Sequence, residues 1–237
     1  MTWSIIAKDK VTGRIGIIVA TKFFAVGARV PHIRTGIGAV ASQAFVNPFY
    51  GRRGLDLMAA GASADDVVRI LTCSDDGRAN RQLHVMDASG RFAAYTGADC
   101  VDWCGHAIHD GVSVAGNMLA GPAVIADTAT AYMSAAAQPF ARRLIAAMLA
   151  GEAAGGDKRG KQSAALLIHD EQEYSLLDLR VDDHADPLAE LARLEAIARE
   201  RWLHFRRHMP SRDNPSGRID RSTLDDDIAQ SLAEGYE

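Results

Sequence analysis

Thr2 is the residue whose position most clearly allows covalent chemistry, because it directly follows the initiator methionine. Methionine aminopeptidase favours a small second residue, so we expect Met1 to be removed and Thr2 to carry a free α-amine. A threonine hydroxyl alone is a poor nucleophile, but an adjacent α-amine can act as its base. The amine has an intrinsic pKa of about 7.7–8.0, close to the operating pH, and therefore needs little tuning. The alternative is that Thr2 only begins a strand.

Candidates for supporting Thr2 follow the second apolar strand, which ends at Ala20. The Thr21 hydroxyl could hydrogen-bond near Thr2, and Lys22 or Arg34 could supply a positive charge there. For Lys22 the sequence favours the simpler interpretation, a solvated lysine at the end of a strand.

Two amide side chains, Gln43 and Asn117, stand at the ends of other predicted strands. Gln43 could bind the amide of a substrate. Asn117 offers both a donor and an acceptor, which would suit an oxyanion or the free amine. The alternatives are a capped strand end for Gln43 and a turn-forming asparagine at 117.

The stretch 155–163, GGDKRGKQS, is a polar glycine-rich loop. Its glycines let backbone amides approach a ligand, and the side chains around them carry charge of both signs. It lacks the spacing of a Walker A loop, so nucleotide binding is not expected. We predict that the loop lies beside Thr2 and contacts the substrate through Asp157, Arg159, Gln162 and Ser163. The alternatives are that Asp157 and Arg159 pair with each other, or that the loop is simply solvated.

Two thiols and two imidazoles within ten residues suggest a zinc site, formed by Cys100, Cys104, His106 and His109. The histidine spacing is not that of a zinc finger. On a strand, Cys104 and His106 share a face, whereas His109 falls on the other. A zinc hydrolase built on Cys104 and His106 is therefore the weakest hypothesis for function, and we expect neither a metal nor a cofactor.

Apolar patterning predicts strands at 2–7, 15–20, a run ending at 42, 82–87, 91–96, 103–108, 112–116, 163–169 and 174–181. Helices are predicted around 55–59, from 63, and at 122–137, 139–151 and 187–205. Strands and helices do not alternate strictly, which argues against a doubly wound sheet. Two packed sheets with helices on both outer faces would satisfy the order. We expect one domain over residues 1–205, followed by a charged, turn-rich segment, 206–237, that forms a flexible tail or a partner-contacting arm.

Seven segments together resemble one uncharacterised prokaryotic family of unknown function whose fold is that of the N-terminal-nucleophile (Ntn) hydrolases. They are 2–7 (TWSIIA), 25–28 (AVGA), 42–48 (SQAFVNP), 81–82 (RQ), 115–119 (AGNML), 155–165 (GGDKRGKQSAA) and 178–184 (DLRVDDH). The resemblance covers roughly residues 1–205. It implies a four-layer αββα sandwich of the α/β (α+β) class, and it implies an enzyme only through that fold, which does not fix function.

The resemblance implies that Thr2 is the nucleophile of an amidohydrolase acting on a small amide or peptide-like bond. It also implies that backbone amides around 42–44 face the reacting carbonyl and stabilise the oxyanion. Proteasome-type members carry an Asp followed by a basic residue where this chain has Thr21 and Lys22, which argues against proteasome-like peptidase activity. The second hypothesis is a non-catalytic protein of the same fold that binds a ligand or assembles with partners.

The composition excludes several classes of partner. A formal net charge of -4 over 237 residues provides no global basic field for nucleic acid or acidic membranes. No window approaches the roughly 20 apolar residues that cross a bilayer, and charged residues arrive too early for a signal peptide. The three cysteines suit a reducing compartment. We therefore expect a cytoplasmic protein with a small-molecule amide or peptide-like substrate, and the formation of a homo-oligomer is left open.

Overall fold

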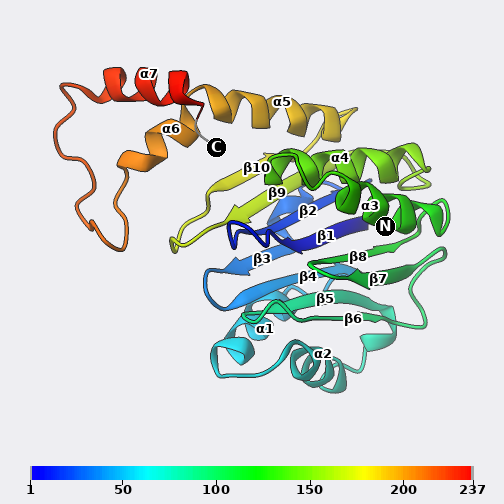
Figure 1. Cartoon of the computed structure of the whole chain (residues 1–237). Helices are drawn as coiled ribbons and strands as arrows, with labels where there is room; N and C mark the ends of the chain where they lie inside the picture. The colour runs from blue at the N-terminus through cyan, green and yellow to red at the C-terminus, as the bar shows by residue number, and fades with distance from the viewer. Residues whose placement is uncertain (1, 236–237) are drawn as a thin grey trace.

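The computed structural model describes residues 2–235, so Met1, whose removal is predicted above, lies outside the described residues. The described chain has a mixed α/β structure with two antiparallel sheets (Figure 1). The strand order is β10-β9-β2-β1-β8-β7 in the six-stranded sheet and β3-β4-β5-β6 in the four-stranded sheet. The predicted mixed α/β class is confirmed.

The strands are β1 (Thr2–Lys8), β2 (Ile15–Thr21), β3 (Pro31–Arg34), β4 (Gly38–Ala44), β5 (Arg81–Asp87), β6 (Phe92–Thr96), β7 (Gly105–His109), β8 (Val112–Asn117), β9 (Ser163–His169) and β10 (Leu177–Val181). The α-helices are α1 (Phe49–Ala59), α2 (Ala64–Cys73), α3 (Ala123–Ser134), α4 (Phe140–Ala153), α5 (Pro187–Glu200), α6 (Trp202–Phe205) and α7 (Leu224–Glu234).

Strand β1 lies at the centre of the six-stranded sheet, where β2 and β8 pair with it on either side. Trp3 and Ile5 belong to the hydrophobic cluster under α3 and α4, whereas Ile6 packs with apolar residues of β4 and β5 in the second sheet. Successive residues of a strand point to opposite faces, so Thr2 and Ser4 share the face of Ile6. This alternation directs the Thr2 side chain into the layer between the two sheets.

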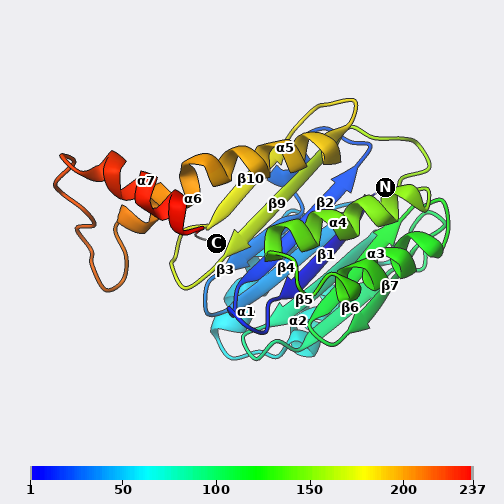
Figure 2. The same ribbon diagram turned by 45° about the horizontal axis from the view of Figure 1, so that its top comes forward.

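Helices cover the outer face of each sheet (Figure 2). Helices α3, α4 and α5 pack on the six-stranded sheet, and α1 and α2 pack on the four-stranded sheet. Helix α2 begins after Ser63, whose Oγ accepts a hydrogen bond from Asp66 N at 3.2 Å, and α5 begins at Pro187 after the cap residue Asp186. Both helix starts agree with the sequence signals. Among residues 2–235, no helix is long and apolar enough to cross a membrane.

Some element boundaries differ from the predicted ones. Strand β3 is not predicted, because it is a short edge strand whose residues are partly exposed and show no apolar alternation. The strand expected at 103–108 begins only at Gly105. The single helix expected at 187–205 is divided into α5 and α6, because Arg201 leaves helical geometry with φ −147° and ψ −44°.

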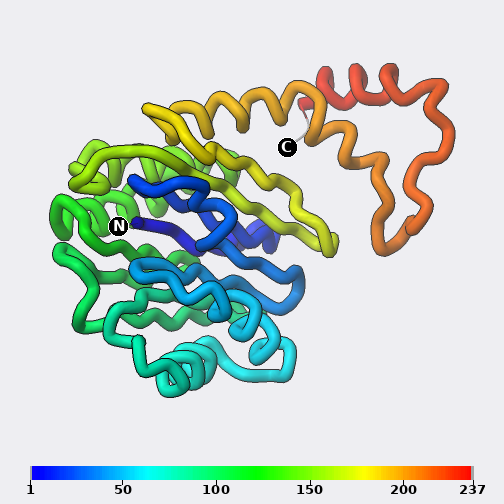
Figure 3. The backbone as a smooth tube through the Cα atoms, turned by 180° about the vertical axis from the view of Figure 1, so that it is seen from behind, coloured from blue at the N-terminus to red at the C-terminus, as the bar shows by residue number. Residues whose placement is uncertain are grey.

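The chain after Phe205 extends to one side of the two sheets and returns as α7 along α6 (Figures 1 and 3). Leu224 and Ile228 of α7 are buried, and Asp225 pairs with Arg201 at 2.7 Å. The sequence predicts a flexible tail at 206–237. The structure shows that most of this segment makes defined contacts, while its mobility stays a prediction.

We expect truncation after Phe205 to lower the melting temperature by no more than a few degrees, because α7 packs mainly on the short helix α6. Truncation after Glu200 is the matched comparison, since it also removes Leu203, a member of the main hydrophobic cluster. That second variant should lose considerably more stability in a thermal melt. Equal losses for both variants would show that the segment after Phe205 is integral to the fold.

Candidate active site around Thr2

The ends of three neighbouring strands meet at Thr2. Its Oγ1 lies 3.2 Å from Oγ1 of Thr21, the last residue of β2. On its other side Thr2 pairs with Asn117, the last residue of β8. Thr2 itself is 7% exposed, so its hydroxyl is largely enclosed.

Two buried amide side chains hold the backbone of Thr2. Gln43 Nε2, which comes from β4 of the other sheet, lies 3.4 Å from Thr2 O and 2.9 Å from Gln82 Oε1. Asn117 Nδ2 likewise lies 3.4 Å from Thr2 O and donates to Gln82 Oε1 at 2.9 Å. Since these amide hydrogens already have acceptors inside the protein, the geometry favours a positioning role for Gln43 and Asn117. Their contact with a ligand stays a prediction.

A buried histidine completes the polar layer between the sheets. His84 Nε2 lies 2.9 Å from Ser4 Oγ, and His84 Nδ1 lies 3.0 Å from Ser113 Oγ. Ser4 Oγ donates its one hydrogen to Gln43 Oε1 at 2.7 Å, so it accepts from His84 Nε2–H, and Nδ1 accepts from Ser113. Burial lowers the pKa of His84 to about 3, so this imidazole is neutral near pH 7. The network connects His84 through Gln43 to the backbone of Thr2.

A cavity of about 90 Å³ opens beside the Thr2 hydroxyl. It is lined by Thr2, Thr21, Phe23, Val26, Arg29, Val30, Gln43, Ala44 and Val46. Its walls are mostly apolar, and Arg29 is the one charged side chain among these lining residues. An apolar cavity of about 150 Å³ holds benzene, so this cavity suits a smaller aliphatic group.

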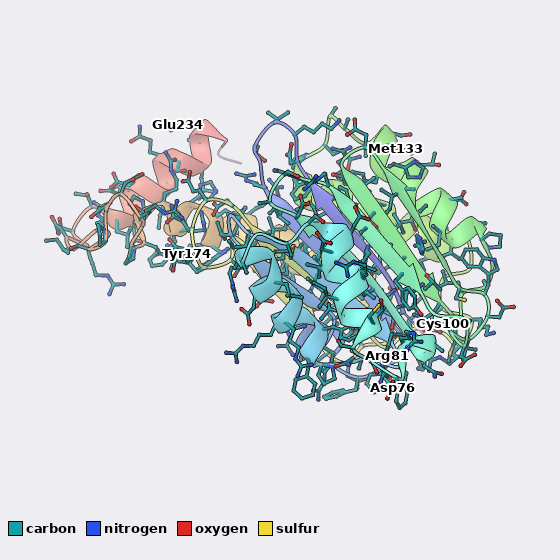
Figure 4. The ribbon with its side chains drawn as sticks, turned by 90° about the horizontal axis from the view of Figure 1, so that it is seen from below. Asp76, Arg81, Cys100, Met133, Tyr174 and Glu234 are labelled. Atoms are coloured by element: carbon teal, nitrogen blue, oxygen red, sulfur yellow. The ribbon has the colours of Figure 1, made fainter. Side chains whose placement is uncertain are left out.

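The loop between β4 and α1, which carries Val46, is braced by a partly buried ion pair. Arg81 Nε donates to Asp75 Oδ2 at 3.0 Å, and Tyr50 OH donates to the same oxygen at 2.8 Å. The Arg81 guanidinium holds the pKa of the Asp75 carboxyl well below its usual range. Arg81 and Cys100 lie close together at one end of the sheets (Figure 4), and Cys100 Sγ donates to Arg81 O at 3.3 Å. Asn47 Nδ2 donates to Asp75 Oδ2 at 3.1 Å and Arg81 Nη1 donates to Phe45 O at 2.5 Å, so the ion pair holds the residues on both sides of Val46.

The glycine-rich loop lies next to Thr21. Gln162 N donates to Thr21 O at 3.0 Å, and Ser163 pairs with Thr21 across β9 and β2. The Thr21 hydroxyl in turn contacts Thr2, so Thr21 connects the loop to the proposed nucleophile. Gln162 Nε2 donates to Asp183 Oδ1 at 3.1 Å, and Ser163 Oγ donates to Phe23 O at 2.6 Å.

The charged residues of the loop organise its backbone. The Asp157 carboxylate is 2% exposed, accepts from Lys22 N at 2.7 Å and pairs with Arg159 at 3.3 Å. The structure therefore contains the internal ion pair that the sequence left as an alternative. Binding of a substrate by Asp157, Arg159, Gln162 and Ser163 stays a prediction.

Lys22 and Arg34, the two candidates for a positive charge beside Thr2, do not lie at the Thr2 hydroxyl. Lys22 is exposed, and its Nζ donates to Lys161 O at 3.0 Å. Arg34 pairs with Asp56 at 2.8 Å beside the four-stranded sheet. Neither side chain lines the Thr2 cavity, whose cationic residue is Arg29.

The cysteine–histidine segment makes ordinary structural contacts. Cys104 Sγ donates to Cys100 O at 3.5 Å, and His106 Nδ1 lies 2.9 Å from Thr96 Oγ1. Within the described part of the chain, no group of three or more His, Cys, Asp or Glu residues could hold a metal ion.

Arg29, Gln82 and His84 are among the site residues that are absent from the sequence-based candidates. Gln82 and His84 alternate with apolar residues along β5, a pattern that indicates a polar strand face without showing that another sheet covers it. Arg29 stands in an irregular segment after a short 3-10 turn, where no periodic signal exists.

Comparisons with known proteins give a family for the chain. Residues 2–191 match the model of a family of unknown function, DUF1028. The crystal structure of protein SPO2555 from Silicibacter pomeroyi, assigned to the same family model, is 34% identical with a TM-score of 0.85. That match covers 92% of this chain and 99% of the other.

A further solved structure, Anbu (ancestral beta-subunit) from Yersinia bercovieri, is 10% identical with a TM-score of 0.41, over 83% of this chain and 94% of the other. That likeness is too weak to support an argument. A comparison with curated proteins found no match. The family match and the Silicibacter structure lead to one conclusion: this chain belongs to the DUF1028 family.

Proposed function

We propose that the protein is an amidohydrolase of the Ntn type, with Thr2 as nucleophile, that acts on a small amide or peptide-like bond. The observation that carries the proposal is the position of the Thr2 side chain. It begins the central strand, faces the layer between the sheets and lines a cavity of about 90 Å³. Two sheets between helical layers support a four-layer αββα sandwich of the Ntn type.

In the first step Thr2 Oγ1 attacks the carbonyl carbon of the substrate, and its proton passes to the α-amine that removal of Met1 exposes. The Thr21 hydroxyl, 3.2 Å away, orients the Thr2 hydroxyl. The carbon–nitrogen bond then breaks, and the leaving amine takes the proton from the α-amine. The same α-amine then deprotonates a water molecule, which attacks the ester. The bond between the acyl carbon and Thr2 Oγ1 breaks, Oγ1 takes the proton back from the α-amine, and the acid leaves.

The oxyanion that forms in both steps requires a hydrogen-bond donor. The backbone N–H of Val46 donates to no acceptor among the described residues, and Val46 lines the Thr2 cavity. We assign it as the oxyanion donor in this mechanism, two residues beyond the segment 42–44 that the sequence suggests. One such donor is worth about 3–4 kcal/mol of transition-state stabilisation.

The arrangement of cations favours one alternative, a non-catalytic protein that uses the same cavity to bind a ligand. Lys22 and Arg34 interact elsewhere, so neither helps to tune the Thr2 amine. In the mechanism proposed here the intrinsic pKa of the α-amine, about 7.7–8.0, is sufficient for a base near neutral pH.

A β-lactone probe tests the proposal, because a nucleophilic hydroxyl opens the ring and retains every atom of the probe as an ester. We expect the intact mass of the purified protein to lack Met1 and to increase by one probe per chain. Peptide mapping should place the adduct on Thr2. A retained Met1 or an acetylated Thr2 would remove the base and contradict the proposal, and a processed but unlabelled Thr2 would favour the non-catalytic alternative.

A further inference from the structure

We propose that Arg29 selects substrates whose acyl group is short, aliphatic and ends in a carboxylate. The inference rests on the proposed function, since it concerns the part of the substrate that becomes esterified to Thr2. The acyl group remains attached to the Thr2 hydroxyl after the amine leaves, so it occupies the cavity that this hydroxyl lines. The lining residues of that cavity therefore determine which acyl groups fit.

The shape and chemistry of the cavity restrict the acyl group. Apolar walls are formed by Phe23, Val26, Val30 and Val46, which suits methylene groups next to the carbonyl. A volume of about 90 Å³ is smaller than the apolar cavity of about 150 Å³ that binds benzene, so it favours a group of a few carbon atoms. These features favour a short aliphatic chain.

The positive charge of Arg29 favours a negatively charged group at the end of the acyl chain that is remote from the carbonyl. The guanidinium of Arg29 makes no ion pair or hydrogen bond with the described residues, and the cavity has no carboxylate among its lining residues. A ligand carboxylate in the cavity would therefore meet no competing carboxylate from the lining residues. A guanidinium binds a carboxylate with two parallel hydrogen bonds, a stronger contact than a neutral amide can make.

The segment that carries Arg29 is held in place before any ligand arrives. Ala25 N donates to Asp182 O at 3.0 Å, and Val26 N donates to Ser163 Oγ at 3.2 Å. Gly27 lies so close to β9 that a Cβ at this position would come within 2.7 Å of the Ala165 side chain. A fixed backbone reduces the entropy lost when the side chain binds an anion.

Hydrolysis of three 4-nitroanilides tests the inference. Glutaric acid mono-4-nitroanilide carries the carboxylate, its terminal carboxamide is a neutral isostere, and pentanoic 4-nitroanilide lacks the polar end. Reaction with water gives glutarate and 4-nitroaniline, which is measured by absorbance. We expect kcat/KM for the carboxylate to exceed that for the carboxamide by about tenfold to hundredfold.

In Arg29→Gln the ratio of kcat/KM for the carboxylate to kcat/KM for the carboxamide should fall to about one, because a neutral amide cannot pair with the carboxylate. Arg29→Lys should retain part of the preference, because it keeps the charge and loses the bidentate geometry. The matched control is Arg52→Gln, an exposed arginine on α1 whose side chain is 88% exposed, which should keep the full preference. A preference that persists in Arg29→Gln, or its absence in the wild type, would overturn the inference even if Thr2 is labelled.

A binding measurement separates this inference from the proposed function. Calorimetry on the Thr2→Ala variant compares the affinities of the glutaric mono-anilide and its carboxamide without any turnover. The carboxylate should bind at least about tenfold more tightly, and the advantage should disappear in the Thr2→Ala/Arg29→Gln double variant. If Thr2 proves unreactive but this advantage exists, the nucleophile assignment falls and the carboxylate site stands. Equal affinities would overturn the carboxylate site.

Discussion

Replacing Thr2 with alanine should abolish covalent labelling and lower kcat/KM by at least about 10³-fold, because the substitution removes the attacking oxygen. Thr2→Ser should retain labelling, since serine keeps a hydroxyl and an α-amine on the same residue. Alanine and serine are both small, so removal of Met1 should proceed in both variants. The measurements are kcat/KM on the glutaric mono-anilide and the mass of the protein after treatment with the β-lactone.

The structure allows the loss of chemistry to be separated from a loss of folding. The described Thr2 side chain contacts Thr21 Oγ1 at 3.2 Å, and one such neutral hydrogen bond contributes only about 0.5–1.5 kcal/mol to stability. Thr2→Ala should therefore unfold within a few degrees of the wild type. Thr12→Ala, in the exposed turn between β1 and β2, is the matched control and should leave activity unchanged. Activity that survives in Thr2→Ala would rule out Thr2 as the nucleophile.

Hydrophobic patterning predicts the parts of this fold in which burial is regular. Ile15 to Ala20 is almost continuously apolar, and β2 is indeed buried on both faces between helices and the second sheet. Helices α2 and α5 begin at the residues that carry capping signals. These features are local, so a single sequence contains enough information to identify them.

Contacts between the two sheets are much harder to predict. Gln43 reaches the carbonyl of Thr2 across 41 positions of sequence and from a different sheet. Its partner Gln82 contributes to the same network from β5, where alternating polar residues resemble an ordinary solvated strand face. Sequence periodicity distinguishes the two faces of a strand, but it does not reveal which face is covered by another sheet.

The positions of the charged side chains are equally hard to predict from sequence. Lys22 directly follows Thr21 and is therefore a natural candidate from sequence, yet its side chain turns toward the carbonyl of Lys161. Arg29 comes seven positions later in an irregular segment, and it is this residue that lines the cavity with Thr2. Proximity in sequence to a nucleophile does not determine where a long, flexible side chain ends.

The neutral state of His84 should make the protein less stable as the pH falls. The pKa of an unfolded histidine is about 6.5, whereas burial lowers that of folded His84 to about 3. Below about pH 6.5 His84 binds a proton in the unfolded state and stays neutral in the folded state. The free energy of unfolding therefore decreases progressively toward pH 3. The contribution of His84 to the free energy of unfolding should be about 3 kcal/mol smaller at pH 4 than at pH 7.

His84→Gln tests this prediction, because glutamine does not titrate and retains a donor and an acceptor for Ser4 and Ser113. Urea unfolding between pH 7 and pH 4 should show a shallower loss of stability in this variant than in the wild type. Burial also lowers the pKa values of His32, His106 and His169, so the wild-type slope contains several contributions and the variant removes one of them.

His109→Gln, at an exposed position, is the matched control for replacing an imidazole with an amide. If the His84→Gln variant is too unstable to measure, the ring protons of His84 can be followed by NMR in the wild type. They should show no titration near pH 6.5 while the protein is folded. A titration there, or identical slopes for wild type and variant, would mean that the imidazole accepts a proton inside the fold. The hydrogen-bonded chain from Ser113 to Gln43 could not then have the arrangement described here, because a protonated Nδ1 is a donor and can no longer accept the hydrogen of Ser113.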